Sequence, residues 1–225
     1  MTIQWDNYWQ KLRWRVSEEI RNCEHRQDVK IFEKYLMDCN VILEAGCGIG
    51  SVCRYLSMKT RGIVVGCDIS LVGLRMAMAE RSENTQYLRA DVRRLPFRDK
   101  SFDAVLSLGV IEHMEDPTEP VAEIGRVLKG GGITFISTPN AYCYHHRITR
   151  FIKSRLGVWQ LGTERSFTAN HLTCLLRNQT LHPIQIGYFY WGKKPLNRIF
   201  KKYFERILKR FGSMAYVLAE KPLIP

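Results

Sequence analysis

VILEAGCGIG, residues 41–50, joins a short apolar run to a turn that contains three glycines. The run lacks polar alternation, as expected of a strand that is covered on both faces. Gly46, Gly48 and Gly50 permit a tight turn and let the backbone approach a ligand without a Cβ in the way. A helix through about Leu56 should follow, and we expect exposed N–H groups at its start to meet the polar end of a ligand. The segment therefore predicts a strand–turn–helix unit that binds a small molecule.

The same rhythm of apolar runs and amphipathic stretches continues along the chain. The pattern predicts further strands at residues 62–68, 85–91, 102–109 and 133–139, and helices at 71–81 and 120–130. The second of these helices should end at the glycine run 130–132, where a positive φ stops a helix. Alternation of helices with such covered strands predicts a parallel sheet that carries helices on both faces.

Three acids lie at or near the ends of successive strands. Asp68 closes the second strand, twenty residues after Gly48, where a carboxylate can accept both hydroxyl protons of a ribose. Asp91 closes the third strand, in position to meet an adenine amino group, and Glu44 precedes the glycines. Asp68 or Asp91 alone could merely cap a helix or a turn. The three acids together with the glycines favour a nucleotide site.

Four stretches resemble the successive motifs of class I S-adenosylmethionine-dependent methyltransferases, most closely the subgroup of ubiquinone-biosynthesis and small-molecule enzymes. They are VILEAGCGIG, VVGCDIS, RADVRRLPFRDKSFDAVLSLGVIEHMEDP and LKGGGITFISTPN. The resemblance runs from about Val41 to Asn140 and more loosely to the end. A dehydrogenase is the obvious rival, but its glycines are usually spaced G-x-G-x-x-G, whereas this chain has G-C-G-I-G.

The resemblance implies an α/β fold with a doubly wound, mostly parallel seven-stranded sheet of the Rossmann-like type. The last strand would be antiparallel. Residues 183–191 and 213–221 would be the sixth and seventh strands, with an added amphipathic helix before the seventh. The usual connection between these two strands in the family is more direct.

The resemblance also implies S-adenosylmethionine as the cofactor and S-adenosylhomocysteine as the product. The glycines would lie along the methionine part, Asp68 would hold the ribose hydroxyls, and Asp91 would meet the adenine edge. The implied cofactor-binding residues are Glu44, Gly46, Gly48, Gly50, Asp68, Ile69, Asp91, Val92 and Leu108.

His113 is the candidate catalytic residue. It follows Glu112 just past the fourth strand, at the carboxyl edge where ligands bind in open α/β sheets. Histidine titrates near neutrality and can take a proton from an acceptor hydroxyl; the alternative is a histidine that orders this loop. Some quinone-pathway O-methyltransferases that resemble this chain carry E-x-x-E-H here and are associated with a divalent metal. Because Gly109 stands in place of the first glutamate, one anionic oxygen ligand is lost, and we predict no metal site.

The net charge of +12 predicts affinity for an anionic partner. Two basic segments, residues 141–165 and 195–212, exceed the minimal fold and should lie near the mouth of the active site. In the second, apolar side chains recur at three- and four-residue steps, which predicts an amphipathic helix over 195–211. We expect either that this helix packs on the domain or that it contacts an anionic membrane surface.

The sequence thus predicts one methyltransferase domain over residues 1–225, with a helical cap at 1–40 and a cofactor-binding core at 41–140. We expect methyl transfer (EC 2.1.1.-) by in-line displacement to a small or lipid-linked acceptor, at oxygen. The expected location is the cytoplasm or the cytoplasmic face of a membrane, because no signal peptide or spanning run is present in the sequence. An RNA methyltransferase that uses the basic face, with nucleic acid as the less favoured partner, and a non-catalytic cofactor-binding protein are the alternatives. The oligomeric state is left open.

Overall fold

The computed structural model describes residues 2–12, 18, 22–159, 162, 164–190 and 212–223. The amphipathic helix predicted over residues 195–211 therefore lies outside the described residues. So does most of the segment 13–21, which belongs to the predicted helical cap.

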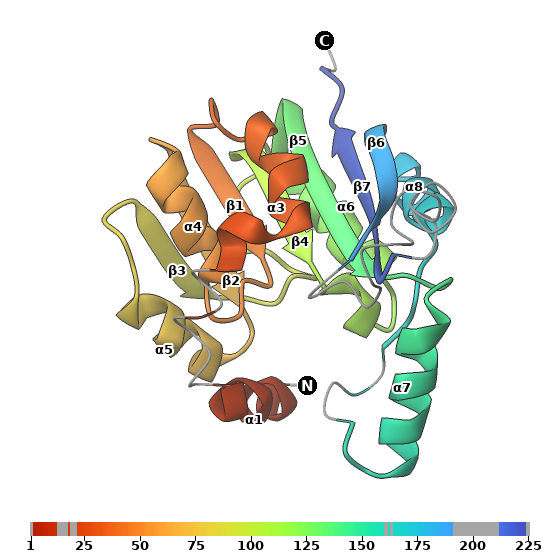
Figure 1. Ribbon diagram of the computed structural model, residues 1–225. Coiled ribbons are helices and arrows are strands. Elements are labelled where there is room, and N and C mark those ends of the chain that lie inside the picture. Colours follow the sequence, from red (N-terminus) through yellow and green to blue (C-terminus); the bar gives the residue numbers. More distant parts are fainter. Residues whose placement is uncertain are drawn as a thin grey trace.

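Seven strands form one sheet in the order β3-β2-β1-β4-β5-β7-β6 (Figure 1). The pairs from β3 through β5 are parallel, and β7 runs antiparallel to both of its neighbours, β5 and β6. The strands are β1 Val41–Ala45, β2 Ile63–Asp68, β3 Thr85–Arg89, β4 Phe102–Leu108, β5 Leu128–Pro139, β6 His182–Phe189 and β7 Met214–Glu220. The predicted α/β fold, with its mostly parallel sheet and antiparallel last strand, is confirmed.

Helices cover both faces of the sheet (Figure 1). Alternate residues of a strand point to opposite faces, so Ile42 of β1 packs in one apolar core while Leu43 packs in the other. The first core contains side chains of α3 and α4, and the second contains side chains of α6 and α8. The helices are α1 Thr2–Leu12, α3 Gln27–Phe32, α4 Ser51–Lys59, α5 Leu71–Ala79, α6 Thr118–Val127, α7 Tyr144–Arg155 and α8 Ala169–Arg177, with short 3-10 turns at Cys23–His25, Glu33–Tyr35 and Ile111–His113.

The boundary between α6 and β5 differs from the prediction. The sequence predicts a helix that continues to the glycine run, but α6 ends at Val127 and the residues from Leu128 onward belong to β5. Leu128 is extended, with φ −75° and ψ 134°, is fully buried and lies opposite Phe102 of β4. Burial of this leucine in the sheet therefore ends the helix three residues before the first of the glycines.

The strand order reverses between β1 and β4. From β1 the chain adds β2 and β3 on one side of the sheet, and it then crosses to the other side of β1 to add β4 and β5. At such a switch point the loops after the two strands part and leave a crevice at the carboxyl edge of the sheet. Figure 1 shows α1 and α7 beyond this same edge, below the ends of the parallel strands. No helix in the described part of the chain combines the length and the apolar character that crossing a bilayer requires.

Candidate active site

The glycine turn after β1 adopts a backbone that other residues disfavour. Gly46, Gly48 and Gly50 have φ values of 84°, 53° and 70°, in the left-handed region that is costly for residues with a Cβ. A Cβ on Gly48 would overlap the indole ring of Trp9, and a Cβ on Gly46 would overlap the side chain of Val110. The turn therefore needs glycine both for its conformation and for close packing.

Several amides of this turn donate within the protein rather than to open space. The N–H groups of Gly46 and Cys47 donate to the carbonyl of Cys67 at 2.8 and 2.9 Å, and the N–H of Gly50 donates to Cys47 at 2.8 Å. The N–H of Gly48 donates to a carboxylate oxygen of Asp68 at 2.8 Å. The turn thus uses these four amides to hold itself together and against β2, and the expectation for the amides at the start of α4, which begins at Ser51, stays a prediction.

Asp68 ends β2 and lies directly beside the glycine turn. Its second carboxylate oxygen accepts the N–H of Ser70 at 2.8 Å, and burial raises the pKa of this carboxyl. Each carboxylate oxygen offers more than one lone pair, so Asp68 can still accept hydroxyl protons while it holds the two amides. The structure thus places the acid and the glycines together, as the sequence predicts.

Asp91 follows β3 by two residues and is paired with Arg93. The Arg93 guanidinium donates to both carboxylate oxygens, with Nη2 at 2.6 Å from Oδ2 and Nε at 3.1 Å from Oδ1. These hydrogen bonds hold the pKa of Asp91 below its usual range. Asp91 is therefore ionised near neutrality and lies at the edge of the crevice, about a third exposed at its side chain (31%).

Glu44 lies beneath the glycine turn. Its carboxylate accepts the backbone N–H of Cys53 at 3.1 Å and the thiol of Cys53 at 2.9 Å, which ties the first turn of α4 to β1. Burial raises the pKa of Glu44 to about 7. It does not line either of the cavities described below.

A small cavity of about 70 Å³ lies at the switch point. Five of the implied cofactor-binding residues line it, together with the candidate catalytic residue His113: Gly46, Asp68, Ile69, Asp91 and Val92. Gly48, Gly50, Glu44 and Leu108 are not among the lining residues. Gly50 packs instead near Ala77 and Tyr87, and Leu108 is buried at the end of β4.

Five further residues line the small cavity without having been identified from the sequence: Trp5, Ala90, Gly109, Val110 and Met114. Ala90 and Met114 are direct neighbours of Asp91 and His113 in the chain, and Gly109 and Val110 begin the loop that carries His113, so adjacency could have suggested them. Trp5 belongs to α1 and carries no signal in the sequence that links it to the crevice. Gly109 replaces the first glutamate of the E-x-x-E-H pattern. Its φ is 72°, a conformation that glutamate disfavours, so the loop as folded here suits glycine.

Helix α1 closes over the crevice. Trp9 packs on Gly48, Trp5 lies edge-on to the His113 ring at a centroid distance of 4.8 Å, and Asp6 accepts the N–H of Val72 at 3.1 Å at the start of α5. The buried indole Nε1 of Trp9 has no hydrogen-bond partner among the described residues.

These features fit a nucleoside cofactor, provided that α1 moves to enlarge the cavity. Asp68 offers carboxylate lone pairs at the cavity, Gly46 lets the backbone line it without a Cβ, and the buried Trp9 indole lies against the same glycine turn. Small-molecule pockets usually measure about 300–1,000 Å³, well above the 70 Å³ of this cavity. Entry of a nucleoside therefore requires α1, with Trp5 and Trp9, to shift outward from the turn.

A second, much larger cavity of about 1070 Å³ adjoins the first. His113 and Met114 line both cavities, so they form the boundary between them. The remaining lining residues come from the loop after β4, from α7 and from the segment after α7: Glu112, Glu115, Arg147, Ile148, Arg150, Phe151, Ser154, Trp159, Gly162, Glu164 and Arg165.

Glu112 is a buried acid in the wall of the larger cavity. Its side chain is 3% exposed and its Oε1 lies 4.0 Å from Nε2 of His113. Its other oxygen has no hydrogen-bond partner in the part of the chain that the structure describes. Burial raises the pKa of Glu112 well above its usual range, because the buried wall disfavours the charged form of this carboxyl.

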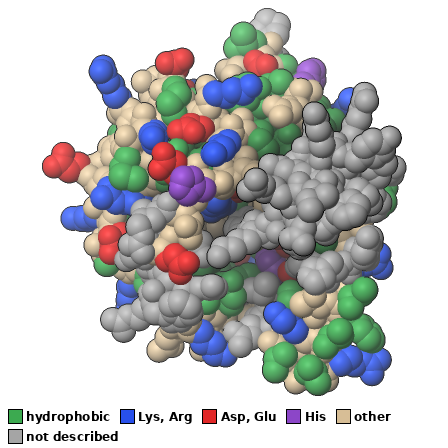
Figure 2. Space-filling view, in the orientation of Figure 1, with side chains coloured by type: hydrophobic (Ala, Val, Ile, Leu, Met, Phe, Trp, Pro, Cys, Tyr) green, Lys and Arg blue, Asp and Glu red, His purple; other side chains and the backbone are tan. Residues whose placement is uncertain are grey.

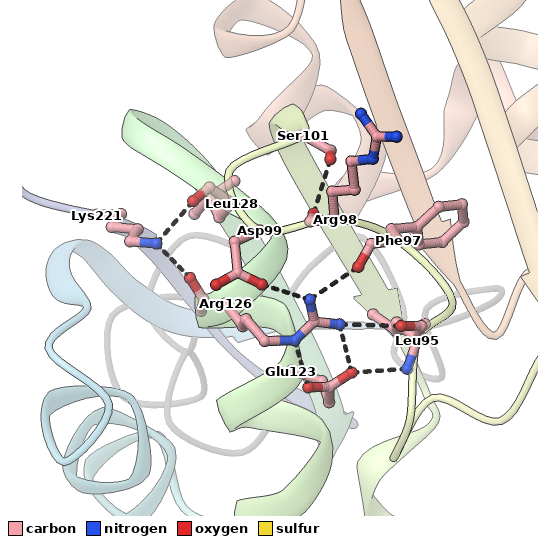
Figure 3. Close-up of polar contacts among 10 residues, drawn as sticks. Leu95, Phe97, Arg98, Asp99, Ser101, Glu123, Arg126, Leu128 and Lys221 are labelled. Carbon is pink, nitrogen blue, oxygen red and sulfur yellow. Dashed lines mark hydrogen bonds and ion pairs between the residues drawn. The ribbon is translucent and has the colours of Figure 1, made fainter.

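Arg126 of α6 fixes the loop after β3, residues 90–101 (Figure 3). Its guanidinium donates to the carbonyl oxygens of Leu95 at 2.9 Å and Phe97 at 2.8 Å. It also pairs with Glu123, whose carboxylate accepts the N–H of Leu95 at 2.7 Å. The loop that carries Asp91 is thus anchored to α6 through Leu95 and Phe97.

Residues 43–136 match the family model described as "Methyltransferase domain". A probable S-adenosylmethionine-dependent methyltransferase of Mycobacterium tuberculosis is 31% identical over 54% of this chain and 44% of its own length. A mitochondrial ubiquinone biosynthesis O-methyltransferase of Dictyostelium discoideum is 34% identical over 44% of this chain and 35% of its own length. A tRNA (carboxymethyluridine(34)-5-O)-methyltransferase of Arabidopsis thaliana is 33% identical over 48% of this chain and 26% of its own length. The chain thus spans less than half the length of these relatives.

The fold also has solved counterparts. A crystal structure from Thermotoga maritima, described as an S-adenosylmethionine-dependent methyltransferase and possible histamine N-methyltransferase, superposes with a TM-score of 0.73. The superposition covers 98% of this chain and 100% of the other at 18% sequence identity, so it supports the fold alone. The resemblance to class I methyltransferases that the sequence motifs carried is confirmed, and with it the cofactor that this family implies, S-adenosylmethionine.

Proposed function

We propose, from the premise that residues 43–136 form a class I methyltransferase domain, that this chain transfers the methyl group of S-adenosylmethionine to an acceptor held in the larger cavity. S-adenosylhomocysteine is the product. The observation that carries the proposal is the boundary between the two cavities, because His113 and Met114 line both. An acceptor in the larger cavity therefore meets a nucleoside in the smaller one at His113.

The residues that would hold the cofactor are those around the glycine turn. Asp68 would accept the ribose hydroxyls, while Ile69 and Val92 of the small-cavity wall would contact the base. The cofactor supplies an electrophilic methyl group on a sulfonium centre, so the main tasks of the protein are alignment and exclusion of water. Trp5 and Trp9 of α1 serve the second task when α1 covers the crevice.

His113 is placed to take the proton of an acceptor hydroxyl as its oxygen attacks the methyl carbon. Its imidazole lies in the boundary wall, held edge-on by Trp5. The hydroxyl proton moves to His113 as the methyl carbon leaves sulfur, and a carboxylate at Glu112, whose Oε1 lies 4.0 Å from Nε2 of His113, would stabilise the imidazolium. This pair favours oxygen as the methylated atom, because a hydroxyl needs a base in a way that an uncharged amine does not.

We propose a small or lipid-linked acceptor with an apolar body and an anionic group. Supporting this, the larger cavity combines apolar side chains (Met114, Ile148, Phe151 and Trp159) with the guanidinium groups of Arg147 and Arg165, while Arg150 pairs with Glu164 of the same wall. The relative from D. discoideum is named for ubiquinone biosynthesis, which also favours a lipid acceptor. The anionic membrane surface expected to contact residues 195–211 stays a prediction, because that segment lies outside the described residues.

The test uses methyl-labelled adenosylmethionine with fractions from the cells that produce the protein. We expect label to move into the organic-solvent extract with the wild type, and we expect His113→Gln to lower this rate at least about a hundredfold while S-adenosylhomocysteine affinity changes little. The matched control is His171→Gln, an exposed histidine on α8. Equal rates for wild type and His113→Gln would remove His113 from the chemistry.

The same experiment separates the alternatives. Transfer of label to the RNA fraction would support an RNA methyltransferase, which the A. thaliana relative named for a tRNA and the net charge of +12 keep in view. Binding of S-adenosylhomocysteine without transfer to either fraction would support a non-catalytic cofactor-binding protein. Either result contradicts the proposed acceptor.

A further inference from the structure

Helix α7 and the turn after it expose large apolar side chains to solvent. Ile148, Phe151, Ile152, Leu156 and Val158 are 55%, 60%, 51%, 69% and 54% exposed, and we call these five residues the α7 patch. They make up five of the fourteen exposed large apolar residues found in the described part of the chain. A patch that concentrates such side chains within eleven residues marks an interaction site, whereas single exposed apolar residues do not.

The patch has the geometry of one helical surface. Ile148, Ile152 and Leu156 recur at four-residue steps, and Phe151 lies three residues after Ile148, so they gather along one side of α7. Figure 1 shows α7 extending away from the sheet beyond its carboxyl edge. In Figure 2 the same place, at the lower right, shows green apolar and blue basic side chains next to one another.

Basic residues are interspersed with the patch. Arg147, Arg150, Lys153 and Arg155 all belong to α7, and residues 141–163 contain no Asp or Glu. The Arg155 guanidinium lies 5.3 Å from the centre of the Phe151 ring, so charge and apolar surface are in contact. Arg150 turns instead to Glu164 at the larger cavity.

This combination fits an anionic bilayer better than nucleic acid. Aliphatic side chains gain little from nucleic acid, which is bound by basic grooves and aromatic stacking. Apolar side chains gain free energy when they enter the acyl boundary of a membrane, and lysine and arginine beside them pair with anionic headgroups. The absence of acids in 141–163 also removes the charge that such headgroups would repel.

The patch adjoins the larger cavity. Ile148 and Phe151 belong to the patch and also line the cavity, together with Ser154 from the same helix. A membrane that contacts the patch is therefore in contact with residues at the wall of the cavity. The patch is thus continuous with the wall of the cavity that ends at His113.

We propose that the α7 patch docks this protein on anionic lipid bilayers and that the acceptor is a membrane lipid taken from that surface. The second half of this statement rests on the proposed methyl transfer; the first half does not. The docking site lies at residues 148–158 and is distinct from the segment 195–211.

Flotation with phospholipid vesicles tests the docking. We expect the wild type to float with phosphatidylcholine vesicles that contain phosphatidylglycerol and to stay largely in solution with phosphatidylcholine alone. Phe151→Ser with Ile152→Ser should lower the partition coefficient at least about tenfold, since two apolar side chains leave the acyl boundary. Lys153→Glu with Arg155→Glu should abolish the preference for phosphatidylglycerol.

A matched control uses Ile184 and Ile186, which are 47% and 44% exposed on β6. Ile184→Ser with Ile186→Ser should float like the wild type. Thermal unfolding and S-adenosylhomocysteine calorimetry of every variant should match the wild type, so that a failure of the methyltransferase proposal is seen separately from a failure of docking.

Several outcomes would overturn the proposal. One is wild-type protein that fails to float; another is the Phe151 and Ile152 variant floating as the wild type does. A concentration-dependent dimer that this variant breaks, without any vesicle binding, would assign the patch to a second copy of the chain. Retention on RNA that depends on the patch, in place of flotation, would assign it to nucleic acid.

Discussion

Glu44, Asp68 and Asp91 occupy similar places in the sequence pattern, but their surroundings differ in the structure. Arg93 holds Asp91 in its ionised form, whereas Asp68 accepts two backbone amides in a buried position. Glu44 lies behind the turn and anchors α4 through Cys53. Burial and partners, rather than position in the motif, decide which acid can meet a ligand.

The pH dependence of stability should report on Glu44. Burial raises its pKa from 4.5 to about 7, so the folded protein holds a proton between these values that the unfolded chain releases. The contribution of this group to the free energy of unfolding is therefore complete below the lower value and is lost as the pH rises through the upper one. Glu44→Gln should remove this loss. Between pH 4.5 and about 7, the free energy of unfolding of the variant should therefore rise relative to that of the wild type by up to about 3 kcal/mol.

Urea unfolding at a series of pH values measures this difference. Glu80→Gln, at an exposed acid at the end of α5, is the control and should follow the wild type at every pH. A Glu44→Gln curve that runs parallel to the wild type would mean that Glu44 titrates normally in the folded protein.

At the residue scale, the sequence was informative where a residue ends an apolar strand. Asp68 could be placed at the crevice because β2 runs into it without polar alternation. The Arg93 partner of Asp91 and the internal use of the Gly48 amide could not be predicted, because both depend on how a loop folds back on itself. The roles assigned to the cofactor-binding residues and to His113 stay predictions.

Among the elements, α1 has the most direct effect on the glycine turn. Gly48→Ala should destabilise the protein for two reasons: φ at this position is 53°, which costs a residue with a Cβ about 1–2 kcal/mol, and the new Cβ overlaps Trp9. In a Trp9→Ala background the second reason disappears. The cost of Gly48→Ala should therefore fall by about 1 kcal/mol or more when Trp9 is absent.

Chemical unfolding of the wild type, the two single variants and the double variant completes this cycle. Equal costs of Gly48→Ala in the two backgrounds would show that α1 does not rest on the turn in solution. Addition of S-adenosylhomocysteine should also change the fluorescence of Trp9, because α1 has to move for the nucleoside to enter.

The loop after β3 depends on Arg126 of α6. Arg126→Met should lower the free energy of unfolding by about 1–3 kcal/mol, because the carbonyls of Leu95 and Phe97 lose their charged donor. It should also weaken binding of S-adenosylhomocysteine, since the same loop carries Asp91. Arg98→Met, at an exposed position of that loop, is the matched control.

Urea unfolding of both variants measures their free energies of unfolding, and calorimetry measures their affinities for S-adenosylhomocysteine. If Arg126→Met and Arg98→Met behave alike, the network in Figure 3 contributes nothing measurable to the loop.

At the scale of elements, apolar runs predicted most strands to within one or two residues. The exception is β5, which begins at Leu128, because burial of Leu128 against β4 outweighs the local signal of three glycines. The segment 141–165 was predicted only as a basic addition, and its helix α7 was not identified. The three- and four-residue spacing of Ile148, Phe151, Ile152 and Leu156 is a helical signal that the basic character of the segment obscured.

For the molecule as a whole, the order of the strands accounts for the position of the site. Reversal between β1 and β4 brings the glycine turn and the His113 loop to one edge. The alternation of strands and helices in the sequence predicted a parallel sheet but not this strand order. The two cavities and their shared wall could not be predicted, because their shape depends on how α1 and α7, from distant parts of the chain, pack around the crevice.

The central claim is that the glycine turn and Asp68 together bind adenosylmethionine, and calorimetry with S-adenosylhomocysteine tests it most directly. Asp68→Asn should weaken binding at least about tenfold, by the loss of charged hydrogen bonds. The control is Asp103→Asn, since Asp103 also accepts two backbone amides, from Asn40 at 2.9 Å and Val41 at 2.8 Å, away from the crevice. Asp103→Asn should bind like the wild type. Wild-type protein that does not bind S-adenosylhomocysteine, or Asp68→Asn with unchanged affinity, would contradict the account.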